Sequence, residues 1–294
     1  MSDIHHNAAN SDTKLKVSLV LNTAFTIFEF IVGILSGSLA LLSDAGHNLT
    51  DTLSIIISIF GNKVAQREAN PEHSYGYGRA SILTALLNAG ILVLLAFYIF
   101  YEAAHRIFSH PREVSGLTIM MVALVGILVN GTIAFILSKD KKDLNVKSTF
   151  INMAFDAIAL VGTLIAGFLI SMTHQSVIDP IISIFIGIML LYAAFRVARE
   201  SVHVLLEGIP EGMDVEKVKE LIRTTPKVKG VDDMHLWAIS SHYAALSCHI
   251  VIEDCDVQES IKIVKSIKDK LKEKFHIEHA TIETELTECT PEKI

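Results

Sequence analysis

Long apolar runs separated by short polar links dominate the first two thirds of the chain. Each run approaches the roughly 20 residues that a helix needs to cross the hydrocarbon core of a membrane. Polar and charged residues gather in the links and after residue 205. The pattern predicts six transmembrane helices, over residues 15–35, 39–60, 82–107, 117–137, 150–172 and 178–202.

The last part of the chain has a different pattern. Helical spacing follows Asp214, a candidate N-cap, and a lysine-rich amphipathic segment indicates a second, longer helix. Alternation of apolar and polar residues indicates three strands, and one sheet covered on one face by two helices is a stable two-layer arrangement. The predicted helices cover residues 215–223 and 257–275, and the predicted strands cover 231–239, 243–252 and 279–286.

Composition supports a division into a membrane part and a polar part. Of the 294 residues 51% are hydrophobic and 19% are charged, whereas charged residues make up about a quarter of an ordinary soluble domain. The mean hydropathy is +0.45. We therefore expect an N-terminal tail over residues 1–14, an α-helical membrane domain over 15–205 and an α+β domain over 206–294.

Basic residues predict the orientation. Lysine and arginine gather before the first run, after the second, after the fourth and at the end of the sixth, whereas the alternate links carry few of them. By the positive-inside rule both termini and the α+β domain are expected in the cytoplasm. Compact loops and the lack of a targeting segment favour the cell membrane, plasma or inner, and thus contact with the lipid bilayer.

Charge and cysteine usage exclude other classes. The net charge is -7 and no basic stripe is present, so nucleic acid is not an expected partner. Cys248, Cys255 and Cys289 lack the spacing of a CxxC pair, which fits a reducing compartment better than a disulfide framework.

Two predicted membrane helices carry polar pairs within apolar surroundings. In the second helix His47 and Asp51 are four residues apart and share one face, with Asp44 two turns before Asp51. In the fifth helix Asn152 and Asp156 have the same spacing. Ionisable groups inside a membrane are costly, and they mark an ion or proton pathway.

The two pairs together suit a divalent cation. They offer one imidazole, two carboxylates and one amide oxygen, which is a plausible tetrahedral set for zinc, and the two carboxylates offset the charge of the ion. For Asn152 alone, a hydrogen bond between helices is an alternative. Two unneutralised carboxylates would be a costly way to hold helices together.

Several longer stretches resemble the cation diffusion facilitator family. The stretches are SLALLSDAGHNLTD, HSYGYGRASI, KDLNVKS, SVHVLLEGIP, MHLWAISS, ALSCHIVIED and HATIETE, within a match from about Leu15 to Leu286. They are most similar to those of bacterial zinc, cadmium and cobalt exporters. The resemblance implies a homodimeric antiporter that exports a divalent metal from the cytoplasm in exchange for protons, with a metallochaperone-like cytoplasmic domain.

The resemblance also implies a transport site. His47 and Asp51 match the pair on the second helix, and Asp156 matches the second residue of the pair on the fifth. Asn152 departs from the pattern, since zinc-specific members have histidine there. An amide oxygen is a harder donor than imidazole, so Asn152 is expected to widen the range from Zn²⁺ towards cobalt, iron or manganese. His47 then remains the near-neutral titrating ligand, with Asp44 a further candidate for proton coupling.

The resemblance points to three secondary features. Some members bind metal in the loop before the third helix, where this chain offers His73. A basic residue there pairs with an acidic residue after the sixth helix, here Arg79 and Glu207, although two separate solvated charges are the alternative. Family tails bind regulatory metal, and the candidate ligands here are His249, Glu285, Glu283 and His235. For His235 the role of a packed strand residue is an equal alternative.

Two other classes of protein were weighed against a transporter. An intramembrane metalloprotease would need an activating carboxylate beside its zinc, typically in an HExxH motif, and the sequence has none. We therefore do not expect an enzyme. A membrane-bound sensor would bind metal without moving it, and a measurement of metal flow against protons separates that alternative from transport.

Overall fold

The computed structural model describes residues 2–108, 113–138, 144–240 and 243–286; the side chains of residues 2–16, 144–149 and 151–152 are not described. It divides into two compact units. The helical unit comprises residues 1–56 and 88–196, and the mixed unit comprises residues 57–87 and 197–294. The boundary between the units falls inside helices, and each unit is described by itself.

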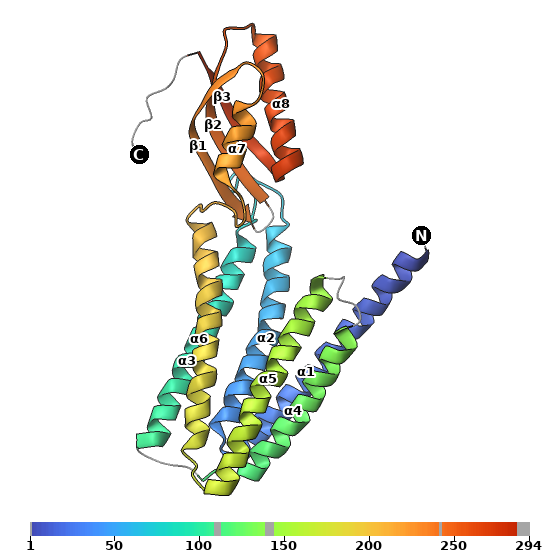
Figure 1. Ribbon diagram of the computed structural model, residues 1–294, viewed down its shortest axis with the longest axis vertical. Coiled ribbons are helices and arrows are strands. Elements are labelled where there is room, and N and C mark those ends of the chain that lie inside the picture. The colour runs from blue at the N-terminus through green and yellow to red at the C-terminus, as the bar shows by residue number, and fades with distance from the viewer. Residues whose placement is uncertain (1, 109–112, 139–143, 241–242, 287–294) are drawn as a thin grey trace. The chain divides into compact units, whose positions relative to one another are not determined.

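Each predicted membrane run lies in one long helix (Figure 1). Five of these helices are long and apolar enough to cross a membrane within the described residues, and the exception is α2. Its polar residues, Asp44, His47 and Asp51 among them, lower its hydropathy. The helices are α1 (Ser2–Ser36), α2 (Leu39–Ala65), α3 (Ala80–Phe108), α4 (Gly116–Leu137), α5 (Leu144–Thr173) and α6 (Ile178–Leu205).

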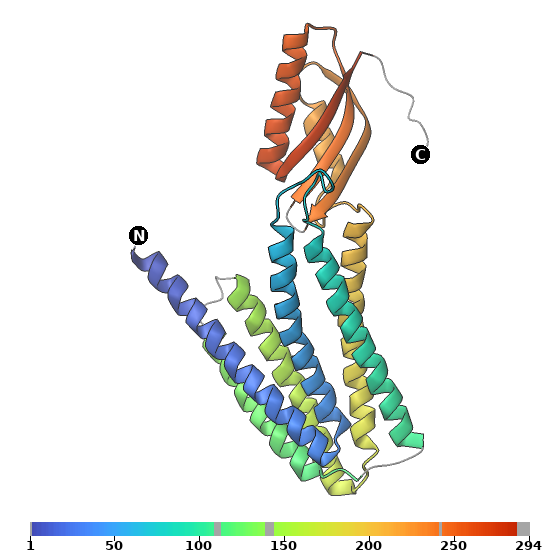
Figure 2. The ribbon, with the colours of Figure 1, turned by 180° about the vertical axis from the view of Figure 1, so that it is seen from behind.

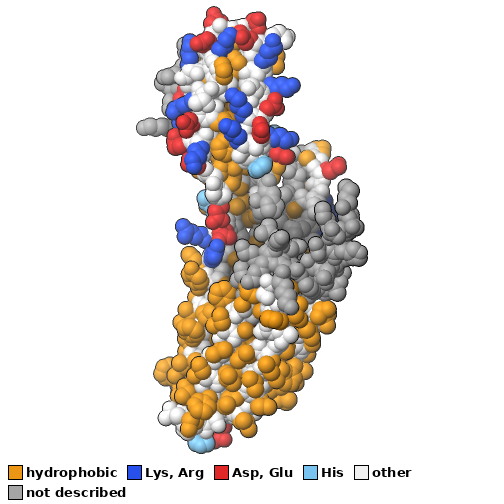
Figure 3. Space-filling model, turned by 45° about the vertical axis from the view of Figure 1, so that its right-hand side comes forward, with side chains coloured by type: hydrophobic (Ala, Val, Ile, Leu, Met, Phe, Trp, Pro, Cys, Tyr) orange, Lys and Arg blue, Asp and Glu red, His pale blue; other side chains and the backbone are white. Residues whose placement is uncertain are grey.

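The outer surface of the helical unit is apolar. Large side chains point outward along its helices, and Leu94 and Tyr192 are 71% and 74% exposed. Figure 3 shows hydrophobic side chains covering the visible surface of these helices. A water-soluble protein rarely exposes so much contiguous apolar surface. The unit is therefore built to face lipid, as the hydropathy pattern predicts.

Glycines bring three helices of this unit close together. A Cβ atom at Gly116 of α4 would lie 2.4 Å from the carbonyl oxygen of Gly167 in α5. One at Gly126 of α4 would lie 2.4 Å from the Phe25 ring of α1. Close backbone approach through small residues is how helices pack without a hydrophobic driving force. As a result, α1, α4 and α5 lie side by side in both ribbon views (Figures 1 and 2).

The tail forms the predicted α+β layers. The sheet has the order β1-β2-β3, in which β1 and β2 are antiparallel and β2 and β3 are parallel. Both helices pack on one face, where Ile222, Leu246 and Ile267 are fully buried. The elements are α7 (Val215–Arg223), β1 (Val228–Ser240), β2 (Tyr243–Ile252), α8 (Val257–Phe275) and β3 (Ile277–Glu285).

Element boundaries in the tail mostly agree with the prediction. Asp214 caps α7, and its side chain accepts hydrogen bonds from the backbone N–H groups of Glu216 and Lys217. The bond from Lys217 lowers the pKa of the Asp214 carboxyl. Strand β1 begins three residues before the predicted residue 231, and β3 begins two before residue 279. Residues 241–242 of the predicted turn lie outside the described residues.

Candidate metal centres

Helices α2 and α5 bring three of the predicted transport ligands together. His47 Nδ1 lies 3.8 Å from Asp51 Oδ1, one turn further along α2. His47 Nε2 lies 4.0 Å from Asp156 Oδ1 of α5. The side chain of Asn152, the fourth predicted ligand, lies outside the described side chains. The imidazole thus stands between two carboxylates from different helices.

These distances are longer than the distances between donors that share one bound ion. Donors around a tetrahedral zinc lie about 3.3 Å apart, given bonds of about 2.0 Å. Within the described residues no group of three or more His, Cys, Asp or Glu side chains is arranged to hold a metal. One ion can be bound by Nε2 of His47 and by the Asp156 carboxylate. Asp51 faces Nδ1 of His47. Its side chain must therefore either rotate to reach the same ion or orient the imidazole ring through Nδ1.

A second pair of carboxyl groups lies beside this site. Asp44 is buried three residues before His47, and Glu29 of α1 is fully buried and interacts with Asp44. Neither oxygen of Glu29 has a hydrogen-bond partner in the described part of the chain, and Oδ2 of Asp44 has none either. Glu29 was not among the predicted site residues, although its place as the lone acidic residue in the run 15–35 was a signal.

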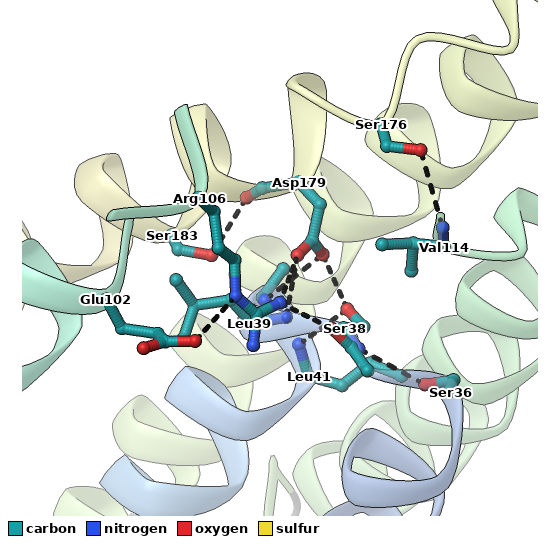
Figure 4. Close-up of polar contacts among 12 residues, drawn as sticks. Ser36, Ser38, Leu39, Leu41, Glu102, Arg106, Val114, Ser176, Asp179 and Ser183 are labelled. Atoms are coloured by element: carbon teal, nitrogen blue, oxygen red, sulfur yellow. Dashed lines mark hydrogen bonds and ion pairs between the residues drawn. The ribbon is translucent and has the colours of Figure 1, made fainter. Parts of the chain in front are cut away.

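The end of the helical unit near Ser38 holds a buried carboxylate that is fully paired (Figure 4). Asp179, in the first turn of α6, is fully buried and accepts hydrogen bonds from Ser38 Oγ and from the backbone N–H of Leu39, both at 2.6 Å. It thereby caps the N-terminus of α2 from another helix. Arg106 of α3 lies 3.6 Å from Asp179 and 2.9 Å from Glu102. This cluster, the Asp179 node, joins three helices.

In the mixed unit the predicted tail ligands meet on one side of the sheet. His249 Nδ1 lies 2.9 Å from Glu285 Oε1, and His249 Nε2 lies 3.7 Å from Glu283 Oε2. Asp233, which the sequence analysis missed, lies 3.0 Å from His235 Nε2 and 3.9 Å from His249 Nε2. The tail cluster therefore has five members.

A break in the strand explains why Asp233 was missed. The pairing of β1 with β2 shifts between Asp232 and His235, and Asp233 has a positive φ of 44°. A bulge of this kind interrupts alternation, so the sequence pattern does not give the direction of Asp233. Cys248, next to His249, is buried and points away from the cluster, as expected from a regular strand. Its burial raises the pKa of the thiol to about 12.

The loop between α2 and α3 has its own contacts in the mixed unit. Arg79 Nη2 lies 3.3 Å from Glu207 Oε1, so the structure places the predicted partners together, both partly or largely exposed. The His73 ring stacks on Tyr77 with ring centres 4.4 Å apart. His73, Arg79, Glu207 and His235 line one cavity of about 960 Å³. Metal binding at His73 stays a prediction.

Two family models cover nearly the whole chain. Residues 15–206 match the cation efflux transmembrane domain, and residues 210–286 match the cytoplasmic domain of cation efflux proteins. The chain belongs to the cation efflux, or cation diffusion facilitator, family. The resemblance drawn from the sequence motifs is confirmed, and so is the fold of a helical membrane part followed by an α+β part. Members of the family are transporters.

Curated relatives extend over almost all of the chain. A cadmium, cobalt and zinc/H(+)-K(+) antiporter of Bacillus subtilis is 35% identical over 96% of this chain and 91% of its own length. The metal cation efflux system protein CzcD of Cupriavidus metallidurans is 34% identical over 97% and 90%. The zinc transporter ZitB of Yersinia pestis is 36% identical over 99% and 93%.

The chain is also similar to solved structures. One of them is the metal-bound C-terminal domain of the CzcD transporter from Cupriavidus metallidurans, 38% identical, covering 25% of this chain and 100% of its own, with a TM-score of 0.23.

Proposed function

We propose that this chain exports divalent metal cations, zinc first among them, from the cytoplasm in exchange for protons. The observation that carries the proposal is the position of His47 between Asp51 and Asp156, inside a unit whose outer surface is apolar. The names of the relatives, antiporters of cadmium, cobalt and zinc and a zinc transporter, support it.

The chemistry of the three ligands couples metal to protons. Imidazole binds a metal ion only when the coordinating nitrogen is free of a proton, so protons and metal compete for His47. The two carboxylates supply negative charge that offsets the ion in a medium of low polarity. Transport follows if one state of the protein favours metal and faces inward, while the other favours protons and faces outward.

The substrate range depends on Asn152, which we propose as the fourth ligand. Its amide oxygen is harder than the imidazole of zinc-specific members. We therefore expect cobalt, iron or manganese to be carried beside zinc. Cadmium is a further candidate substrate, which the name of a relative supports. A preference for manganese, iron or cobalt over zinc is the second candidate function, and Asn152 is the observation that favours it.

The mixed unit is proposed to sense metal and to join two copies of the chain. Its tail cluster offers two imidazoles and three carboxylates on one side of the sheet. A regulatory ion would replace the direct contact between His249 and Glu285. The match to the family's cytoplasmic domain supports a homodimer.

The orientation proposed from basic residues places residues 1–14 and 206–294 in the cytoplasm and residues 15–205 in the cell membrane. The Asp179 node then lies at the outer end of the helices, because Ser38 directly precedes α2, at the end of this helix opposite to Lys63. Arg79 and Glu207 would tie the cytoplasmic ends of α3 and α6.

Metal flux into liposomes tests the proposal. Purified protein is reconstituted, a pH gradient is imposed, and uptake of zinc, cadmium, cobalt, iron and manganese is compared. We expect proton-driven flux in the wild type and none in Asp156→Ala, with Glu113→Gln, an exposed carboxylate, as the matched control. Metal that binds but never crosses under any gradient would show a sensor instead.

The same assay tests the role of Asn152. If Asn152 is a ligand that broadens the substrate range, Asn152→His narrows the flux to zinc. An unchanged ranking in Asn152→His would show that Asn152 does not set selectivity, while leaving transport itself intact.

A further inference from the structure

Glu29 and Asp44 form a buried pair of carboxyl groups that the His47 site does not use. Glu29 is fully buried and Asp44 is 3% exposed, and the two groups come from different helices, α1 and α2. They lie close enough to interact directly. Both oxygens of Glu29 and one oxygen of Asp44 have no hydrogen-bond partner among the described residues.

The groups that act on Glu29 do not neutralise it. They are Asp44 and, more weakly, Asp156, and both are acidic. Asp44 also interacts with the imidazole of His47, which the transport site uses. A carboxylate buried without a partner costs several kcal/mol unless a cation or a proton neutralises it. Three buried carboxyl oxygens without a donor therefore indicate that a proton or a cation belongs at this pair.

The position of the pair fits the path of a transported ion. Asp44 precedes His47 by three residues, which is about 4.5 Å along the helix axis, towards the end of α2 that the Asp179 node caps. Glu29 lies seven residues before the end of α1 at the same end of the helical unit. In the proposed orientation the pair is the next group outward from the transport site.

We propose that Glu29 and Asp44 form a second cation site, which receives the divalent metal from the His47 site on its way out. This inference rests on the proposed function. Two carboxylates match the charge of a divalent ion, and their four oxygens suit hard cations such as manganese. A site made of oxygen alone holds zinc less tightly than one with imidazole, which favours onward release.

Manganese binding to the purified full-length chain tests the second site, because Mn²⁺ can be counted by electron paramagnetic resonance. The background variant carries Asp51→Asn, Asp156→Asn and His249→Ala, which disable the transport site and the tail cluster. We expect a single Mn²⁺ ion per chain to remain in this background. Adding Glu29→Gln removes it, and adding Glu113→Gln, the matched exposed carboxylate, does not.

Two further variants keep the test conclusive if Glu29→Gln does not fold. Asp44→Asn in the same background should remove the ion as Glu29→Gln does, and it decides the question if the Glu29 variant does not fold. Glu29→Asp keeps a carboxylate at the same position and should retain the ion with weaker affinity. Size-exclusion profiles identify the variants that are folded.

The proposal is overturned if no ion remains in the background, or if the ion survives both Glu29→Gln and Asp44→Asn. A loss of proton-driven flux in Glu29→Gln with an unchanged ion count would assign the pair to protons alone, which also overturns it. The liposome assay on the wild type distinguishes a failure of the second-site proposal from a failure of the proposed transport function. A wild type that moves no metal refutes transport whatever the manganese count is.

Discussion

Two carboxylates in the helical unit, Asp179 and Glu29, are equally buried but differ completely in their partners. Asp179 accepts hydrogen bonds from Ser38 and from the first residue of α2 and faces Arg106, so the protein supplies partners for its charge. Among the described residues, the charged groups that act on Glu29 are two other carboxyl groups, those of Asp44 and Asp156. The first arrangement holds three helices together. The second costs stability and has a reason to exist only if something else binds there.

The tail cluster lies between these two extremes. Its members are paired with one another, His249 with Glu285 and His235 with Asp233, and they range from half-buried to exposed. Mutual hydrogen bonds and, for the exposed members, water stabilise these groups in the absence of metal. Burial alone therefore does not identify an ion site. A buried carboxyl group without a compensating partner is the better indicator, because its charge requires a cation or a proton.

The largest effect on the free energy of unfolding is expected for a substitution in the Asp179 node. Asp179→Ala leaves Arg106 buried and the N-terminus of α2 uncapped, which should lower the free energy of unfolding by about 3–5 kcal/mol. Chemical unfolding in detergent measures it, with Glu113→Ala as the exposed control. If Asp179→Ala lowers the free energy of unfolding by no more than the control does, the Asp179 node does not hold the three helices together.

A substitution of Glu29 should change the free energy of unfolding in the opposite direction. Glu29→Leu removes orphaned polar atoms from an apolar interior, so the free energy of unfolding should rise by about 1–3 kcal/mol. Proton-driven metal flux should fall in the same variant. Unfolding and liposome flux are measured in parallel, and destabilisation comparable to that of Asp179→Ala would contradict the contrast between the two carboxylates.

In the tail, Asp233 is the member that only the bulge brings into place. Asp233→Ala should weaken metal binding to the tail about tenfold, because both histidines lose a partner that orients them. Zinc titration of the full-length chain in the Asp156→Asn background measures the affinity. Asp254→Ala, an exposed carboxylate of the same unit, serves as control and should leave the affinity unchanged.

The pair of Arg79 and Glu207 should contribute little to stability. Both side chains are exposed, and such pairs contribute about 0.5 kcal/mol. Arg79→Ala is therefore expected to unfold almost as the wild type does. If it instead unfolds several kcal/mol more easily, the loop is tied to the helix end by more than this pair, and a Glu207→Ala variant would show whether the two effects add.

The smallest effect on stability at neutral pH is expected for the titration of the Cys248 thiol. Burial raises the pKa of its thiol to about 12, whereas an unfolded cysteine titrates near 8.5. The folded state therefore binds the proton more tightly, and stability is full below about pH 8.5 and falls as the pH rises above it. Unfolding followed across alkaline pH in wild type and Cys248→Ala measures this. An identical pH dependence in both would contradict it.

Much of the fold follows from local pattern. The apolar runs give the long helices because a helix satisfies every backbone group without water. Spacing alone places His47 above Asp51, and alternation gives the strands of the tail. The difference between α2 and its neighbours also follows from composition, since Asp44, His47 and Asp51 lower its hydropathy.

The sequence by itself thus determined the helices, the two-part organisation and the alignment of His47 with Asp51 on one face of α2, since each depends on residues close together in the chain. The tertiary structure decided which distant groups meet. It placed Asp156 beside His47, Glu29 beside Asp44, and Arg106 with α2 around Asp179. It also turned Asp233 towards two histidines through a bulge. Helix packing and strand register set these contacts, and periodicity within one segment carries no information about either.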